Sequence, residues 1–147
     1  MRATSELQTE VARRLRDVEQ RFTSGRRELV DVLEQADRPL TVPDIVSAAP
    51  SSLPQSSVYR NLTVLVEAGV VRRLLGTDEL ARFELAEDLA GHHHHLLCST
   101  CGAVSDVRAA PKLERALSEA ARLAAEEVGF EVTEHRIDLV GVCSSCR

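Results

Sequence analysis

Tryptophan is absent from this 147-residue sequence, and aromatic residues account for only 3% of it. Any hydrophobic core must therefore consist mainly of leucine, valine and alanine, for which an apolar content of 44% is sufficient. The sequence has no apolar run long enough to span a bilayer, and no apolar signal-peptide region follows its first residues. We therefore expect a cytoplasmic protein without a membrane partner, folded as one domain or as two small ones.

The sequence also lacks the net positive charge typical of nucleic-acid-binding proteins, because its formal charge is −5. Residues 1–83 contain 12 basic and 12 acidic side chains, whereas residues 84–147 contain 6 basic and 11 acidic ones. The acidic excess is thus confined to the second half. This asymmetry indicates two modules, of which the first is compatible with DNA and the second suits cations.

Recognisable catalytic motifs are missing as well. The sequence has no His-Glu-x-x-His, no Gly-x-Ser-x-Gly and no His-x-Glu ahead of a Pro-Cys-x-x-Cys. We therefore expect neither an enzyme nor a small-molecule substrate. Two hypotheses of another class are kept as alternatives: a metal-dependent enzyme with an open histidine and carboxylate site, and a metal-storing or purely structural zinc module.

Potential metal ligands are concentrated in the last third of the chain. Four of the five histidines and two of the four cysteines lie between His92 and Cys101, and the other cysteines are Cys143 and Cys146. In a reducing compartment, two Cys-x-x-Cys pairs are metal ligands more often than disulfides. Two such turns, one with Cys98 and Cys101 and the other with Cys143 and Cys146, can complete a closed tetrahedral zinc site of four thiolates. A redox dithiol or two free pairs are the alternatives.

The first two thirds have the pattern of a winged helix. Apolar residues at helical spacing, with Thr41 as a cap and Gly69 as a stop, predict helices at 5–20, 26–36, 42–48 and 54–68. Two apolar runs, at 70–75 and 81–85, predict strands joined as a hairpin by residues 76–79. A helix-turn-helix followed directly by a hairpin is a winged helix-turn-helix.

The last third is predicted to be a small αβ module. We expect strands at 92–97, 103–107 and 130–140, with a helix from Pro111 to Gly129 between the last two. So small a module would expose sheet edges and apolar surface, which dimerisation would cover. The predicted fold class is therefore α+β: a winged helix-turn-helix domain at 1–86, a hinge at 87–91, and an αβ dimerisation and metal-binding domain at 92–147.

The four consecutive histidines fall on a predicted strand, where alternate side chains face opposite sides. His92 and His94 would then face one way, and His93 and His95 the other. One strand would contribute to two separate metal sites, each needing further ligands from elsewhere. The candidates for those ligands are Glu84, Asp88, Asp106, Glu114 and His135.

Three stretches together resemble the ferric uptake regulator (Fur) family of metal-responsive transcriptional repressors. They are His-His-His-His-Leu-Leu-Cys-Ser-Thr-Cys-Gly at 92–102, Ser-Val-Tyr-Arg-Asn-Leu at 57–62 and Val-Gly-Val-Cys-Ser-Ser-Cys at 140–146. The resemblance implies a homodimer that, when metal is bound, binds double-stranded DNA at a palindromic AT-rich operator. The DNA-binding residues that it implies are Arg21, Arg26, Ser56, Ser57, Tyr59 and Arg60.

The same resemblance implies three metal sites. Zn²⁺ would be structural at Cys98, Cys101, Cys143 and Cys146. A regulatory metal near the hinge would be held by Glu84, His93, His95 and Asp106, the last at the position of a carboxylate ligand in the peroxide-sensing branch. A second metal in the dimerisation domain would be held by His92, His94, Glu114 and His135. Counting back from Gly129 places the glutamate near Ser118 and Glu119 instead, so Glu119 is an alternative to Glu114.

The sequence departs from the family at the hinge. The hinge histidine of the family falls on Pro39, and an aspartate and a cysteine of the zinc-sensing branch fall at about Arg72 and Ala86. The remaining donors, two nitrogens and two oxygens, suit Fe²⁺ or Mn²⁺ as readily as Zn²⁺. The unbroken histidine run resembles the zinc-sensing branch more closely. We expect a repressor of zinc or iron uptake genes, with a peroxide-responsive or a manganese- or nickel-responsive regulator as the alternative.

Overall fold

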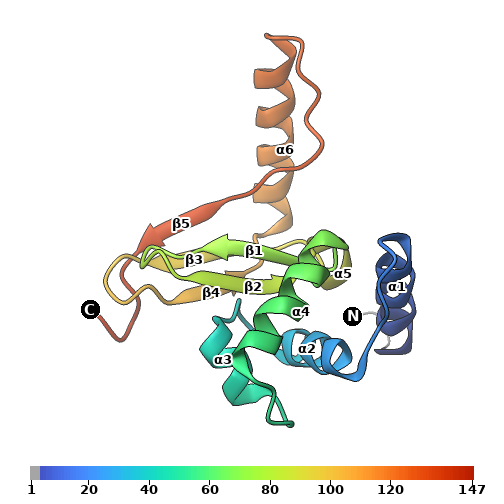
Figure 1. Ribbon diagram of the computed structural model, residues 1–147. Helices are drawn as coiled ribbons and strands as arrows, with labels where there is room; N and C mark the ends of the chain where they lie inside the picture. The colour runs from blue at the N-terminus through green and yellow to red at the C-terminus, as the bar shows by residue number, and fades with distance from the viewer. Residues whose placement is uncertain (1–3) are drawn as a thin grey trace.

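The computed structural model describes residues 4–147 and confirms the α+β class, with a winged helix-turn-helix followed by a small αβ unit (Figure 1). In chain order, the helices are α1 (Thr4–Asp17), α2 (Ser24–Gln35), α3 (Val42–Ala48), α4 (Gln55–Glu67), α5 (Glu87–Ala90) and α6 (Pro111–Glu126). The strands are β1 (Val71–Leu75), β2 (Ala81–Leu85), β3 (His94–Cys98), β4 (Val104–Val107) and β5 (Asp138–Gly141). None of the described helices is long and apolar enough to cross a membrane.

The first four helices and the β1–β2 hairpin surround one hydrophobic core of leucine, valine and isoleucine, with Phe83 from the hairpin. The helix starts follow from local capping. The Thr23 side chain accepts a hydrogen bond from the first turn of α2, and Thr41 forms a reciprocal capping box with Asp44 at the start of α3. These signals can be read in the sequence, and the predicted helices agree with the observed ones to within three residues.

The hairpin pairs β1 with β2 antiparallel, so that Arg72 lies directly opposite Glu84. Its inner strand β2 is buried along nearly its whole length, and Leu40 forms an isolated bridge to Phe83 on its other edge. The hairpin is thus part of the core of this unit rather than an appendage. The segment 87–91, predicted as a hinge, contains the short helix α5, whose Leu89 is buried in the same core.

The second unit is a three-stranded sheet in the order β4-β3-β5, with β3 in the middle. The prediction of a strand over 130–140 is wrong for residues 130–137, since only Asp138–Gly141 pairs, in parallel with β3. The preceding residues run from the far end of α6 back alongside that helix toward the sheet and are not part of any strand (Figure 1). Alternating apolar residues form a strand only where a neighbouring strand supplies hydrogen bonds.

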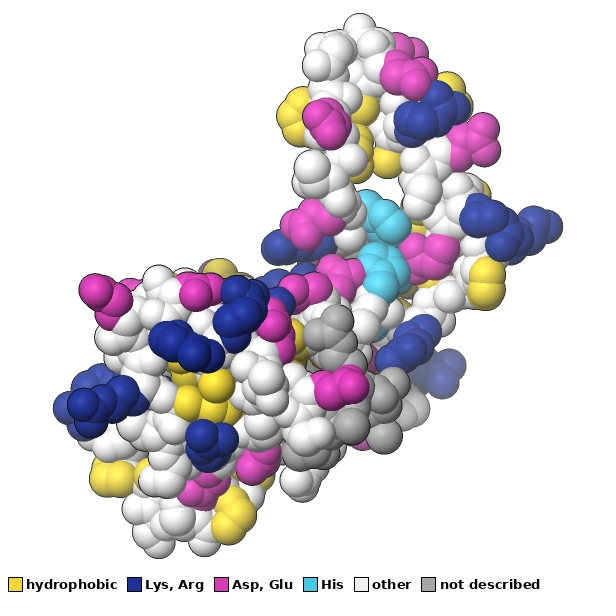
Figure 2. All heavy atoms as spheres, turned by 90° about the vertical axis from the view of Figure 1, so that its right-hand side faces the viewer, with side chains coloured by type: hydrophobic (Ala, Val, Ile, Leu, Met, Phe, Trp, Pro, Cys, Tyr) yellow, Lys and Arg dark blue, Asp and Glu magenta, His cyan; other side chains and the backbone are white. Residues whose placement is uncertain are grey.

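Helix α6 and the segment after it stand clear of the rest of the chain and carry exposed apolar side chains (Figures 1 and 2). Ala125 is the one buried residue of α6, whereas Leu113, Leu123, Val128 and Phe130 are exposed. Apolar surface of this extent on one element is typical of a surface that a second subunit covers.

The core makes a direct prediction for stability. Leu62 of α4 is 1% exposed, so Leu62→Ala should lower the free energy of unfolding by about 2–5 kcal/mol through lost burial and the cavity it leaves. Chemical denaturation at fixed protein concentration measures this change. Leu80→Ala, at a position that is 55% exposed, is the control and should change the same quantity by less than about 0.5 kcal/mol. Equal effects of the two substitutions would contradict the assignment of the core.

Candidate metal centres

Three groups of potential metal ligands come together in the described part of the chain, and each group has four members. Within each group the ligand atoms all lie within 4.8 Å of one another. We name them the cysteine cluster (Cys98, Cys101, Cys143, Cys146), the hinge cluster (Glu84, His93, His95, Asp106) and the histidine cluster (His92, His94, Glu114, His135). These are the groupings predicted from the sequence.

The cysteine cluster joins the two ends of the second unit. Cys98 ends β3, where its neighbour in the parallel pairing with β5 is Gly141, and Cys143 is the second residue after β5. The Sγ atoms of Cys101 and Cys143 are 3.8 Å apart, and none of the four cysteines is in a disulfide. In a tetrahedral site with Zn–S bonds of about 2.3 Å, two sulfurs are about 3.8 Å apart. The spacing therefore fits Zn²⁺.

The backbone around Cys98 favours the thiolate form that zinc binds. Backbone amides of Cys101, Cys143 and Thr100 point at its sulfur and lower the pKa of the Cys98 thiol to about 6. The β1–β2 hairpin, which we call the wing, also contacts the turn that begins at Cys98, because the hydroxyl of Thr77 in the hairpin loop donates a 2.6 Å hydrogen bond to the Cys98 carbonyl. The tip of the hairpin thus contacts the turn that carries Cys98, whereas Cys101 is exposed.

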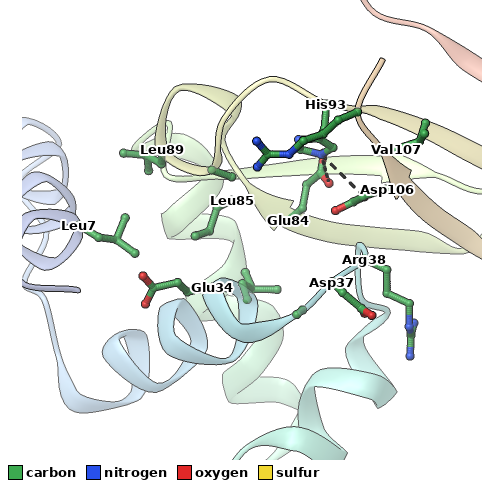
Figure 3. Close-up of a pocket in the computed structure, with 14 residues that line it drawn as sticks. Leu7, Glu34, Asp37, Arg38, Glu84, Leu85, Leu89, His93, Asp106 and Val107 are labelled. Carbon is green, nitrogen blue, oxygen red and sulfur yellow. Dashed lines mark hydrogen bonds and ion pairs between the residues drawn. The ribbon is translucent and has the colours of Figure 1, made fainter. Parts of the chain in front are cut away.

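The hinge cluster is built from both units. Glu84 comes from β2, whereas His95 and Asp106 face each other across the β3–β4 pair. The Nε2 atoms of His93 and His95 lie 3.0 Å and 3.1 Å from the same oxygen of Glu84, Oε2. The same two nitrogens are 3.8 Å and 3.7 Å from Oδ1 of Asp106. Two imidazoles and two carboxylates therefore converge between the units, and Figure 3 shows His93, Glu84 and Asp106 of this group.

The outer nitrogens of both imidazoles are also fixed. Nδ1 of His93 donates to the Gly91 carbonyl at 2.9 Å, and Nδ1 of His95 lies 3.3 Å from Oδ1 of Asp138. A metal-binding histidine usually donates its second ring N–H to a carbonyl or carboxylate. The two rings therefore already have the orientation that ligation through Nε2 requires, and the residues present fit a divalent cation.

Electrostatics keep the hinge cluster charged. Burial alone would raise the pKa of Glu84, but hydrogen bonds from His93, His95 and Arg72 hold that pKa well below its usual range. The hydrogen bond to Glu84 outweighs burial at both histidines and raises their pKa values. Partial burial raises the pKa of Asp106. The cluster therefore places an ionised Glu84 next to two imidazoles whose pKa values are raised.

The hinge cluster opens into a cavity of about 390 Å³ between the units, lined by Leu89, Asp37 and Arg38 among others (Figure 3). Pro39, at the position of the family's hinge histidine, is fully buried and offers no donor. Asp37 and Arg38 lie on the cavity wall and not among the four clustered ligands. The winged-helix unit therefore contributes to this cluster through Glu84 of its β1–β2 hairpin.

In the histidine cluster, three imidazoles gather around one carboxylate. Glu114 lies 3.1 Å from Nε2 of His92, 2.6 Å from Nε2 of His94 and 2.9 Å from Nε2 of His135. Glu114 is in the first turn of α6, close to the sheet, and Glu119 is more than one turn further along and outside the cluster. Histidine side chains are visible at the surface between the two units, beside acidic ones (Figure 2).

The predicted DNA-binding residues lie on or beside α4. Ser56, Tyr59 and Arg60 are exposed, Ser57 is half-buried, and the opposite face of α4 enters the core through Val58, Leu62 and Leu65. Arg21 is exposed just before α2. Arg26 is half-buried and binds Asn61 of α4 and the Arg21 carbonyl. Arg26 therefore joins the segment before α2 to α4.

Sequence reasoning did not assign two residues that contact the clusters, Arg72 and Glu87. Arg72 binds Glu84, and Glu87 contacts Nδ1 of His92. The hairpin register could have revealed Arg72, because strands at 70–75 and 81–85 place it opposite Glu84. Nothing in the sequence pattern indicated Glu87. Asp88, a candidate ligand from the sequence, instead pairs with Arg14 of α1.

Comparisons with known proteins agree on one family. Residues 17–140 match the profile described as "Ferric uptake regulator family". The chain is 32% identical over 135 residues to the "Peroxide operon regulator" of Bacillus subtilis (strain 168), covering 90% of this chain and 88% of that protein. The crystal structure of the Vibrio cholerae ferric uptake regulator matches with a TM-score of 0.69 and 26% identity, over 88% of this chain and 96% of that one.

The fold alone is also shared with the Helicobacter pylori ferric uptake regulator, whose structure is described as revealing three functional metal binding sites. That match has a TM-score of 0.78 and 21% identity, and it covers 99% of this chain and 94% of the other.

The cysteine cluster makes a prediction about metal content and assembly. Cys101→Ser should remove one equivalent of zinc per chain and most of the dimer, because the cluster holds β5 against β3. Metal analysis and light scattering after gel filtration measure the two effects. Thr100→Ala, in the same turn, preserves all four sulfurs and should keep both zinc and dimer. If Cys101→Ser retained them too, the cluster would not hold the unit together.

Proposed function

The chain belongs to the ferric uptake regulator family, and from this premise we propose that it is a metal-dependent, DNA-binding repressor of zinc or iron uptake genes. Members of the family are metal-responsive transcriptional regulators that bind DNA as dimers, and they are not enzymes.

The observation that carries the proposal is the origin of the hinge-cluster ligands. Glu84 lies in the wing, whose strand β2 is part of the same core as α4, whereas His93, His95 and Asp106 lie in or next to the second sheet. A cation held by all four would fix the wing, and with it α4, relative to the second unit. Metal occupancy would thereby set the orientation of α4 in the dimer.

The surface of α4 supplies chemistry for reading DNA. Tyr59 is 49% exposed and offers a ring to a thymine methyl group, and Arg60 offers a guanidinium to a guanine edge or a phosphate. Ser56 and Ser57 precede them in the first turn, and Arg21 and Arg26 lie beside the helix. In a homodimer two copies of α4 would read two half-sites of a palindromic, AT-rich operator.

The types of donor atom in each cluster limit which metal ions it can bind. Four thiolates suit a structural Zn²⁺ at the cysteine cluster, and three imidazoles with one carboxylate suit Zn²⁺ at the histidine cluster. The hinge cluster, with two imidazoles and two carboxylates, accommodates Zn²⁺, Fe²⁺ or Mn²⁺. We propose the hinge cluster as the regulatory site and Zn²⁺ or Fe²⁺ as the regulatory metal.

A second candidate is a peroxide-responsive regulator within the same family. Two observations favour it. Asp106, at the position of a carboxylate ligand in the peroxide-sensing branch, lies with the histidines of the hinge cluster. The chain is also 32% identical to the peroxide operon regulator of Bacillus subtilis. The two candidates differ in what ends DNA binding. A metal-uptake repressor releases DNA when the metal is removed, whereas a peroxide-responsive one releases it on oxidation with the metal still supplied.

An electrophoretic shift assay on DNA from upstream of the chain's own gene tests the proposal. Binding should require added Zn²⁺ or Fe²⁺ and should be reversed by a chelator, at a fixed salt concentration because phosphate contacts depend on salt. Loss of binding after hydrogen peroxide treatment of the Fe²⁺-loaded protein would select the second candidate. Metal-independent binding, or no binding with Zn²⁺, Fe²⁺ or Mn²⁺, would contradict both candidates.

The reading helix gives a further prediction. Arg60→Ala should weaken operator binding by about 1–3 kcal/mol without changing metal content, because the exposed guanidinium contacts DNA and no cluster. Arg122→Ala is the matched control, since this exposed arginine of α6 pairs only with Glu126 of the same helix among the described residues. Operator affinity unchanged by Arg60→Ala would exclude this helix face as the reader.

A further inference from the structure

Arg72 of β1 lies between two acidic side chains. It binds one oxygen of Glu84, with NH2 at 2.5 Å and Nε at 3.1 Å from Oε1. Its other terminal nitrogen, NH1, is 3.7 Å from Oε2 of Glu87 in α5. Arg72 is mostly buried, and the β1–β2 register places it directly opposite Glu84. Glu84 therefore keeps only its second oxygen, Oε2, for the hinge cluster.

Glu87 continues this set of contacts to the histidine cluster. Its second oxygen, Oε1, contacts Nδ1 of His92, whose Nε2 faces Glu114. This repeats the arrangement at the hinge cluster, where an oxygen fixes Nδ1 of each ring and Nε2 faces the shared carboxylate. An oxygen partner on the outer nitrogen fixes the ring for ligation and strengthens the ligand. Glu87 is thus an outer partner of His92.

We propose that Arg72 and Glu87 form a bridge that couples the hinge cluster and the histidine cluster, so that metal in one raises the metal affinity of the other. The contacts run from Glu84 through Arg72 and Glu87 to His92. The positive charge of Arg72 and the negative charge of Glu87 form the two middle members of this series. This inference rests on the metal sites of the proposed function and adds two positioning residues and a direction of coupling.

The direction follows from the geometry of the bridge. Ligation of His92 through Nε2 leaves its Nδ1–H to donate to Glu87, and this hydrogen bond is stronger when the ring is bound to a cation. An ordered Glu87 carboxylate holds Arg72 in place by charge. Arg72 in turn fixes Glu84 with Oε2 directed at the hinge histidines. Because coupling is reciprocal, a metal at the hinge favours the histidine cluster by the same factor.

A cycle of variants measures the coupling. Full-length protein with its cysteine cluster loaded with zinc is titrated with Co²⁺ against a competing chelator. His135→Ala disables the histidine cluster. His95→Ala disables the hinge cluster and thereby shows which part of the Co²⁺ titration comes from that site. In the wild type, disabling the histidine cluster should weaken Co²⁺ binding at the hinge about five-fold or more. In a Glu87→Gln background, the same change should alter hinge affinity less than about two-fold, because the bridge is already broken.

Glu87→Gln should also weaken Co²⁺ binding at the histidine cluster by about ten-fold or more, as expected for loss of an outer partner. Asp88→Asn is the matched control: it removes the neighbouring carboxylate of the same short helix, which pairs with Arg14 and with neither cluster, and should leave both affinities and the coupling intact. Arg72→Gln breaks the bridge from its other end and should abolish the coupling as well.

The outcomes separate the inference from the proposed function. Co²⁺ binding at both clusters with coupling that persists in Glu87→Gln or Arg72→Gln would overturn the bridge alone. Wild-type protein without coupling, or with opposite coupling, would overturn it as well. Absence of Co²⁺ binding at the hinge cluster would overturn the proposed function and the inference together.

Discussion

The alternation of side chains along residues 92–98 is the constraint on which all three clusters of potential ligands depend. The strand predicted from His92 begins at His94, so that His92 and His93 precede β3 and still face opposite sides. His92 and His94 face α6, His93 and His95 face the wing, and Cys98 begins the turn that holds four thiols. The register is fixed on one side by pairing with β4 and on the other by β5. A slip by one residue would exchange the two histidine pairs and separate each from its carboxylate.

Two glutamates organise the histidines through direct contacts. Glu84 receives two imidazoles on one oxygen and Arg72 on the other, and Glu114 gathers three imidazoles. Burial of an unpaired carboxylate would be costly, so at the buried Glu84 these contacts are needed for folding as well as for binding. The same contacts hold the rings near the positions that a cation requires, which reduces the reorganisation needed when metal binds.

Stability is distributed unevenly between the two units. The hydrophobic core runs from Leu7 to Leu89 and belongs to the winged-helix unit. The second unit buries few apolar side chains, and those of α6 and the following segment are largely exposed. A unit of this size with so small a core depends on other sources of stability, and four thiolates around zinc and a second subunit are two that its sequence provides for.

The sequence by itself determined the helices and strands of the winged helix and the division of the four consecutive histidines between two sites, because capping, apolar period and strand alternation are local properties. The resemblance to the family, and no local pattern, assigned the carboxylates and His135 to those sites. Only the tertiary structure shows that Glu114, and not Glu119, lies beside the three histidines, since this depends on where α6 starts relative to β3. It also restricted the last strand to residues 138–141, because pairing requires a neighbour. The contacts of Arg72 and Glu87 join segments from different elements, and no local pattern encodes the distance between them.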